Sequence, residues 1–157
     1  MVRIPDKVTQ MMRRQKIIIV GSTNKKICNI SPRTAFHVDQ DGSLYWLELF
    51  RHKTLRNLQK NSWCAVAVFD KNKLDGYQLK GNATVVLDRK LKKEMSAKII
   101  DKLTRMHKQR ILKGAKKPNL VKFNTRLVFS LNPNELADSP LAVDADVESL
   151  KAADMQW

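Results

Sequence analysis

The most constraining part of the chain is a strand that turns abruptly into a helix, SLYWLELFRHKTLRNLQKN, from Ser43 to Asn61. As far as Phe50, large apolar and aromatic side chains alternate as in a strand that is buried on at least one face. After residue 54 the leucines take the spacing of a helix. The intervening RHKT, residues 51–54, brings cationic and hydroxyl side chains to the free N–H groups of a helix start. Two interpretations fit this junction: a turn that binds phosphate, or a solvated basic turn in which Thr54 caps the helix.

The rest of the chain consists largely of short strand-like segments joined by turn residues. Connections of hairpin length dominate, which predicts a mainly β, α+β protein whose antiparallel sheet closes as a small barrel with flanking helices. Ser31-Pro32 is expected to interrupt the second strand, because proline cannot donate to a strand ladder, and Gly81 predicts a bulge in the fifth. The expected strands are Lys16–Ser22, Ile27–Ile30, Ser43–Phe50, Trp63–Asp70, Gly76–Asp88 and Phe123–Leu131, and the expected helices are Pro5–Gln15, Lys53–Asn61 and Arg89–Leu112.

A chain of 157 residues fits one domain of common size. We expect the barrel over residues 1–139 and an acidic tail over residues 140–157, with a weak helix from Asp144 to Met155. No apolar run approaches the roughly 20 residues that span a bilayer, and no secretory signal is evident, so a cytoplasmic protein without membrane segments is expected. Cys28 and Cys64 lie among apolar residues of expected strands, which favours buried free thiols over a disulfide. The three histidines are scattered, without the spacing of a metal site.

The net charge of +15 is distributed unevenly along the chain. Residues 89–126 contain 14 Lys or Arg against two acids. Such a surface attracts anions of several kinds, including nucleic acid, anionic membrane and phosphorylated small molecules. Because Phe123 is the only aromatic residue in this segment, it offers few side chains on which nucleic-acid bases could stack. A solvated basic face is the simpler interpretation.

In the order of its segments the chain resembles the pyridoxamine 5′-phosphate oxidase-like superfamily of FMN-binding split barrels. The similar segments are the IIIV strand, NISP in the second strand, DGSLYWLELF followed by RHKT and RNLQKN, CAVAVFD, and YQLKGNATVV. Each is short, but their order and spacing together are fairly specific, and they cover roughly Ile4 to Leu136. The resemblance implies a six-stranded antiparallel split β-barrel, a homodimer, and FMN at the dimer interface.

The resemblance also implies which residues hold the cofactor. The segment from Asn29 to Arg33 would lie along FMN, and the end of the third strand would offer backbone groups to the isoalloxazine ring. A phosphate dianion favours charge-assisted hydrogen bonds, which cationic and hydroxyl side chains of the junction can supply. Ser31 could instead cap a bulge at Pro32, Arg33 could be solvated, and Trp46 is expected in the core. The implied cofactor residues are Asn29, Ser31, Pro32, Arg33, Leu47, Glu48, Leu49, Phe50, Arg51, Lys53 and Thr54.

Three functions therefore remain open at the level of the sequence. The first is an FMN-binding flavoprotein, a small oxidoreductase or electron carrier with an unknown redox partner. It is not expected to be a true pyridoxamine phosphate oxidase, because the tail from Pro140 to Trp157 lacks the Arg and His of that enzyme's substrate motif. The second is a binding module for nucleic acid or an acidic partner. The third keeps the fold but binds a deazaflavin or haem.

Overall fold

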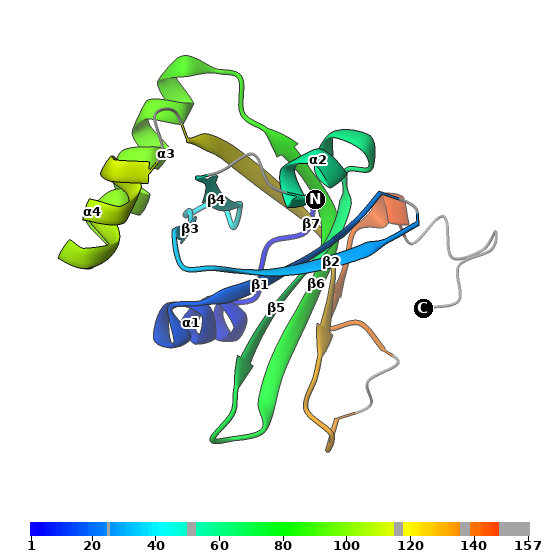
Figure 1. The fold of residues 1–157 in the computed structure, drawn as a ribbon. Coiled ribbons are helices and arrows are strands. Elements are labelled where there is room, and N and C mark those ends of the chain that lie inside the picture. Colours follow the sequence, from blue (N-terminus) through cyan, green and yellow to red (C-terminus); the bar gives the residue numbers. More distant parts are fainter. Residues whose placement is uncertain (25, 50–52, 115–117, 136–138, 148–157) are drawn as a thin grey trace.

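The structure, a computed structural model, describes residues 1–24, 26–49, 53–114, 118–135 and 139–147. Eight strands form one antiparallel sheet that curls into a split barrel, with helices around it (Figure 1). The strand order is β2-β1-β5-β6-β7-β4-β3, and β8 pairs with β7. The elements are α1 (Asp6–Gln15), β1 (Ile18–Thr23), β2 (Cys28–Arg33), β3 (Phe36–Val38), β4 (Leu44–Glu48), α2 (Lys53–Lys60), β5 (Trp63–Asp70), β6 (Asp75–Val85), α3 (Arg89–Asp101), α4 (Arg105–Gly114), β7 (Asn119–Ser130) and β8 (Ala142–Val143).

The predicted α+β split barrel is confirmed. The six expected strands correspond to β1, β2, β4, β5, β6 and β7, and two short strands, β3 and β8, are added to them. In the described part of the chain, no helix combines the length and the apolar composition needed to cross a bilayer.

Strand β4 is buried along its whole length because both of its faces are covered. Leu44 and Trp46 point into the barrel core, which confirms the expected core position of Trp46. Tyr45 and Leu47 face the other way and pack under α3. This double burial explains why the strand is a nearly unbroken apolar run rather than a simple alternation.

Helices close two sides of the barrel. One side of α1 joins the core through Val8, Met11 and Met12, and the helix lies against β5. Helix α3 covers the outer face of β4 with Met95 and Ile99, both of which are buried. Figure 1 shows α1 and α4 together at the left of the view, on the side of the sheet opposite the orange segment that contains β8.

The expected interruption of the second strand at Ser31-Pro32 is wrong, because β2 runs through both residues as far as Arg33. Pro32 lies opposite Ile19 in the antiparallel register with β1. Strand β2 is the edge of the sheet, where one side of the backbone has no neighbouring strand. An edge position tolerates proline because a missing N–H on the unpaired side costs no ladder hydrogen bond.

Two further expectations need correction. The single helix from Arg89 to Leu112 is two helices, and the chain leaves helical geometry at residues 102–104. There the Thr104 hydroxyl accepts a hydrogen bond from the backbone N–H of His107 at 3.4 Å, so a side chain begins the second helix. The two cysteines are free as expected, but only Cys64 is buried; Cys28 is exposed on the outer face of β2.

The strand register shifts between Lys80 and Gly81, which confirms the bulge predicted at the glycine. A Cβ atom at Gly81 would overlap the carbonyl oxygen of Asn124 and lie 3.0 Å from the Cζ atom of Phe123. Both neighbours belong to β7, and Phe123 is fully buried. The close approach of β6 and β7 at this point therefore requires glycine.

We expect Gly81→Ala to lower the free energy of unfolding by about 1–3 kcal/mol, because the backbone and a core ring must move to admit a methyl group. Gly21→Ala is the matched control, since the nearest atom to its added Cβ is 3.8 Å away. Chemical denaturation of both variants tests this. Equal stability of the two variants would contradict the steric argument.

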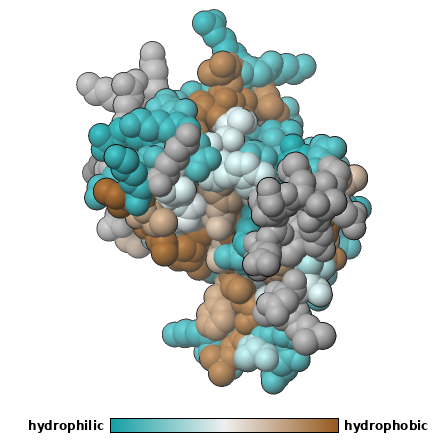
Figure 2. All heavy atoms as spheres, turned by 90° about the vertical axis from the view of Figure 1, so that its right-hand side faces the viewer, coloured by the Kyte–Doolittle hydropathy of each residue, from teal (hydrophilic) through white to brown (hydrophobic). Residues whose placement is uncertain are grey.

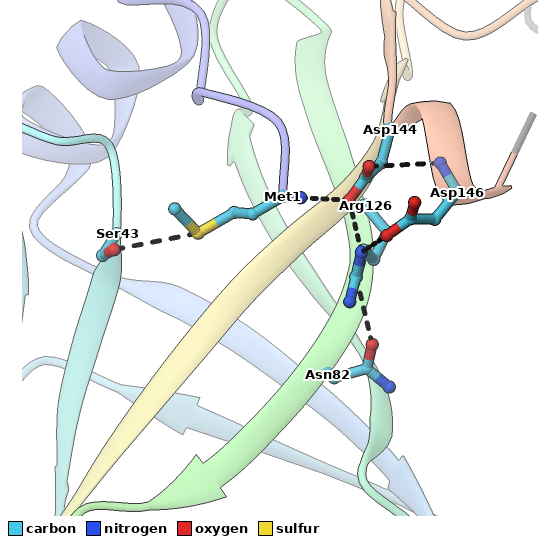
Figure 3. Close-up of polar contacts among 6 residues, drawn as sticks. All are labelled: Met1, Ser43, Asn82, Arg126, Asp144 and Asp146. Carbon is cyan, nitrogen blue, oxygen red and sulfur yellow. Dashed lines mark hydrogen bonds and ion pairs between the residues drawn. The ribbon is translucent and has the colours of Figure 1, made fainter.

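A network of charges attaches the start of the C-terminal tail to the barrel (Figure 3). Strand β8 pairs with β7, and Val147 is buried against Leu127 and Phe129. Asp144 accepts hydrogen bonds from the amino group of Met1 and, at 2.5 Å, from Nη1 of Arg126. These contacts lower the pKa of Asp144 to about 2, the amino group being the largest cause.

The lowered pKa predicts acid sensitivity at this junction. The carboxylate stabilises the folded state fully above its ordinary pKa of 3.8, and this contribution is lost as the pH falls toward the folded value of about 2. Between about pH 5 and about pH 2 the wild type should therefore lose more melting temperature than Asp144→Asn. Thermal unfolding followed by circular dichroism measures both. Parallel pH profiles would show that the carboxylate has no such role.

Candidate functional site

Alternate residues of β2 form a row of polar side chains along one face of this edge strand. Asn29, Ser31 and Arg33 are half-buried, whereas the residues between them are exposed. This alternation follows from the period of two of a strand. The row therefore faces the protein, toward α2 at one end and toward β4 at the other.

Thr54 is the point at which α2 meets this row. Its Oγ1 atom accepts a hydrogen bond from Nδ2 of Asn29 at 3.0 Å and lies 2.9 Å from Oγ of Ser31. The residue is only 1% exposed, so these bonds satisfy a hydroxyl that water does not reach. The sequence predicted these three residues for one site, and the structure brings them together.

Cationic side chains on one face of α2 lie near this cluster of Asn29, Ser31 and Thr54. Lys53, Arg56 and Lys60 line a cavity of about 310 Å³ together with Asn29 and other residues of the β1–β2 hairpin. None of the described residues lining it is acidic, and the first turn of α2 contains no acid. The cavity therefore combines cationic side chains with the positive end of a helix dipole, which suits a phosphate.

Lys53 was predicted from the sequence, whereas the other residues on this face of α2 were not. The side chains at positions 53, 56, 57 and 60 repeat at the three- and four-residue spacing of one helical face, and this spacing was the available signal. Asn57 is buried and donates from Nδ2 to Oγ of Ser22 in β1 at 3.3 Å. It therefore anchors α2 to the sheet, while the cations beside it stay accessible.

At the other end of the row, a buried ion pair joins β2 to β4. Glu48 is 3% exposed, and its Oε1 atom accepts from Nε of Arg33 at 2.9 Å and from Nη2 of Arg33 at 2.7 Å. Trp46 donates to the same oxygen from Nε1 at 2.9 Å. A buried carboxylate needs such partners, because an unpaired charge in the interior is very unfavourable. Arg33 is thus not a solvated side chain, the alternative left open by the sequence.

The ion pair borders a second cavity, of about 200 Å³. Its walls bring together five of the residues that the resemblance implied. Phe50 and Arg51, which the resemblance also implied, lie outside the described residues. The residues lining the cavity are Pro32, Arg33, Thr34, Ala35, Leu47, Glu48 and Leu49.

A third cavity, of about 360 Å³, extends from β2 across β1 to β5 and has mostly apolar walls. Ile30, Trp63 and both cysteines lie along it. Burial raises the pKa of the Cys64 thiol to about 12, so this thiol stays protonated at neutral pH. The cavity offers apolar contact and no nucleophilic thiolate from Cys64.

The sequence and the fold of this chain are similar to those of known proteins. The family model described as pyridoxamine 5′-phosphate oxidase matches residues 4–136. No curated protein matches the chain.

Solved structures share the fold at low sequence identity. HupZ from group A Streptococcus is 17% identical, with 83% of this chain and 95% of that chain covered and a TM-score of 0.67. A protein related to general stress protein 26 from Clostridium acetobutylicum is 16% identical, with 90% and 94% covered and a TM-score of 0.67. HutZ, the heme storage protein from Vibrio cholerae, is 15% identical, with 82% and 94% covered and a TM-score of 0.60. With its family match spanning most of its length and its split barrel intact, the chain belongs to the pyridoxamine 5′-phosphate oxidase family.

Proposed function

We propose that this protein binds FMN and serves as a small flavin-dependent oxidoreductase or electron carrier in the cytoplasm. The observation that carries the proposal is the Asn29–Ser31–Thr54 cluster beside the cationic face of α2. Its donors are ammonium, guanidinium, amide and hydroxyl groups, which are the groups that bind a phosphate dianion. FMN, when bound, supplies hydride or single-electron transfer at its ring.

The chain's own residues bind and orient the cofactor. Lys53 and Arg56 line the open cavity and would hold the phosphate, together with Arg51 of the preceding segment. Thr54 is buried and acts through its partners: it holds Asn29, which lines the cavity, and the neighbouring Ser31 in place. The cavity beside Arg33 and Glu48 would take the edge of the ring.

The identification of the bound ligand could instead reveal a deazaflavin or haem. A deazaflavin would use the same cationic cavity, and the fold is shared with a heme storage protein. None of the cavities described above has a histidine among its described lining residues to serve as an axial ligand for haem. In these three cavities FMN therefore fits the described donors better than haem does.

The purified protein should be yellow and should release FMN on denaturation, as identified by mass spectrometry. Lys53→Ala combined with Arg51→Ala should weaken FMN binding at least about tenfold, because charge-assisted bonds to the phosphate are lost. Lys71→Ala, at an exposed turn, is the control for a change of charge. Fluorescence titration with FMN measures all three proteins.

Thr54 offers a sharper comparison. Thr54→Val removes the hydroxyl that holds Asn29 and Ser31, whereas Thr54→Ser retains it. We expect the valine variant to lose FMN affinity and the serine variant to bind nearly normally. A colourless protein that ignores added FMN, or a double variant with unchanged affinity, would overturn the proposal. No turnover of pyridoxamine 5′-phosphate is expected.

We further propose that two chains pair and that FMN lies between them. Several large apolar side chains are exposed on this part of the sheet, among them Ile27 at 70% and Ile30 at 75% at β2, and Trp63 at 38% in β5. Such side chains favour burial against a partner, and Figure 2 shows apolar surface open to solvent between hydrophilic groups.

Light scattering coupled to gel filtration should therefore give twice the mass of the 18.1 kDa chain. Ile30→Lys should shift the protein toward monomer and weaken FMN binding together with it. Leu87→Lys, at a side chain that is 87% exposed before α3, should leave the dimer intact. A wild-type monomer that still binds FMN would separate the two parts of the proposal.

A further inference from the structure

A cavity on the α1 side of the barrel is distinct from the candidate cofactor site. It has a volume of about 380 Å³, within the range of small-molecule sites. Its floor is apolar and includes Met12, Phe36, Val38 and Leu103. Thr34, one of its lining residues, also lines the cofactor cavity beside Glu48.

The rim of this cavity is cationic. Arg13 and Lys16 come from the end of α1, and Lys102 comes from the break between α3 and α4. Among the described residues, neither Arg13 nor Lys16 has a side-chain hydrogen bond or an ion pair. None of the lining residues is acidic. Arg13 and Lys16 are therefore left without an ion-pair partner among the described residues.

Lys102 shows that this charge is concentrated at the cavity. Its Nζ atom lies 2.7 Å from Nδ1 of His37, which makes His37 the acceptor. Burial lowers the pKa of Lys102, and repulsion from Arg13 and Lys98 lowers it further. An anion in the cavity would relieve this repulsion.

His37 adds no charge of its own to the cavity. Burial, followed by the charge of Lys102, lowers the pKa of His37 below its ordinary value of 6.5, so the ring is neutral at pH 7. Asp39 lies 3.5 Å from Nε2 of His37 and 3.6 Å from Nζ of Lys98. Asp39 also lines a neighbouring cavity together with Arg13, and its charge offsets part of the repulsion on Lys102, whose pKa is lowered nonetheless.

The start of α4 also lies at this cavity. Thr104 lines the cavity and begins α4, a helix of 10 residues with no acid in its first turn. His107, one turn further along, also lines it. The positive end of this helix dipole thus lies at the same cavity as the three cationic side chains.

We propose that this cavity binds a small amphiphilic anion, an apolar ring or short chain that carries a phosphate or carboxylate group. The apolar floor takes the body of the ligand, and Arg13, Lys16 and Lys102 take its charged group. The site works independently of FMN, because its cations come from α1 and the α3–α4 break rather than from α2.

The test uses phenyl phosphate as the probe, with phenol and inorganic phosphate as its two halves. Phenyl phosphate should bind more tightly than either half, and backbone amide NMR signals near Thr34, Lys102 and His107 should shift. Saturation with FMN should leave the affinity unchanged. Benzoate compared with benzyl alcohol shows whether a carboxylate serves as well as a phosphate.

Arg13→Gln combined with Lys102→Gln should weaken phenyl phosphate binding at least about tenfold. Lys71→Gln combined with Lys73→Gln removes the same charge from an exposed turn and should have no effect. The proposal fails if both double variants lose affinity equally, if inorganic phosphate binds as tightly as phenyl phosphate, or if FMN displaces the probe. Displacement of the probe by FMN would place the probe in the cofactor site, and the proposal that the protein binds FMN would still stand.

Discussion

The split in the barrel is bridged by a charged pair of side chains, Arg33 and Glu48. Strand order places β2 at one edge of the sheet and β3 and β4 at the other, so no backbone ladder joins these edges. The guanidinium of Arg33 reaches across with two hydrogen bonds to one carboxylate oxygen, which Trp46 also holds. Removing one partner of a buried pair typically costs about 3–5 kcal/mol, more than most surface contacts. The shape of the cavity beside it depends on this bridge.

The same edge strand serves stability and ligand binding at once. Asn29 and Ser31 hold the first turn of α2, and Arg33, two residues on, closes the barrel. A ligand bound between α2 and β2 would therefore stabilise the fold as well as occupy a site. The cavity on the α1 side, which we call the anion cavity, is formed by other elements, the end of α1 and the break between α3 and α4.

Local patterns made part of this structure predictable. The alternation before Phe50 indicated β4, and an isolated glycine in a strand indicated the bulge at Gly81, because both signals depend on neighbours in sequence. The pairing of Arg33 with Glu48 could not be predicted in this way, since it depends on how the sheet curls. The break after α3 was missed because the apolar spacing continues through Leu103. That break is also what forms the rim of the anion cavity.

Pro32 gives the open edge of the sheet a further property. A strand at an edge presents unpaired N–H and C=O groups that can recruit a strand from another molecule, and proline removes one of those donors. The opposite edge, β3, has only three residues and offers little to pair with. Neither of these two edge strands is thus suited to pair with strands of other molecules into a continuous sheet. This limits amyloid-like stacking of a protein that exposes isoleucines. Any association of two chains would then proceed through side chains on the sheet face.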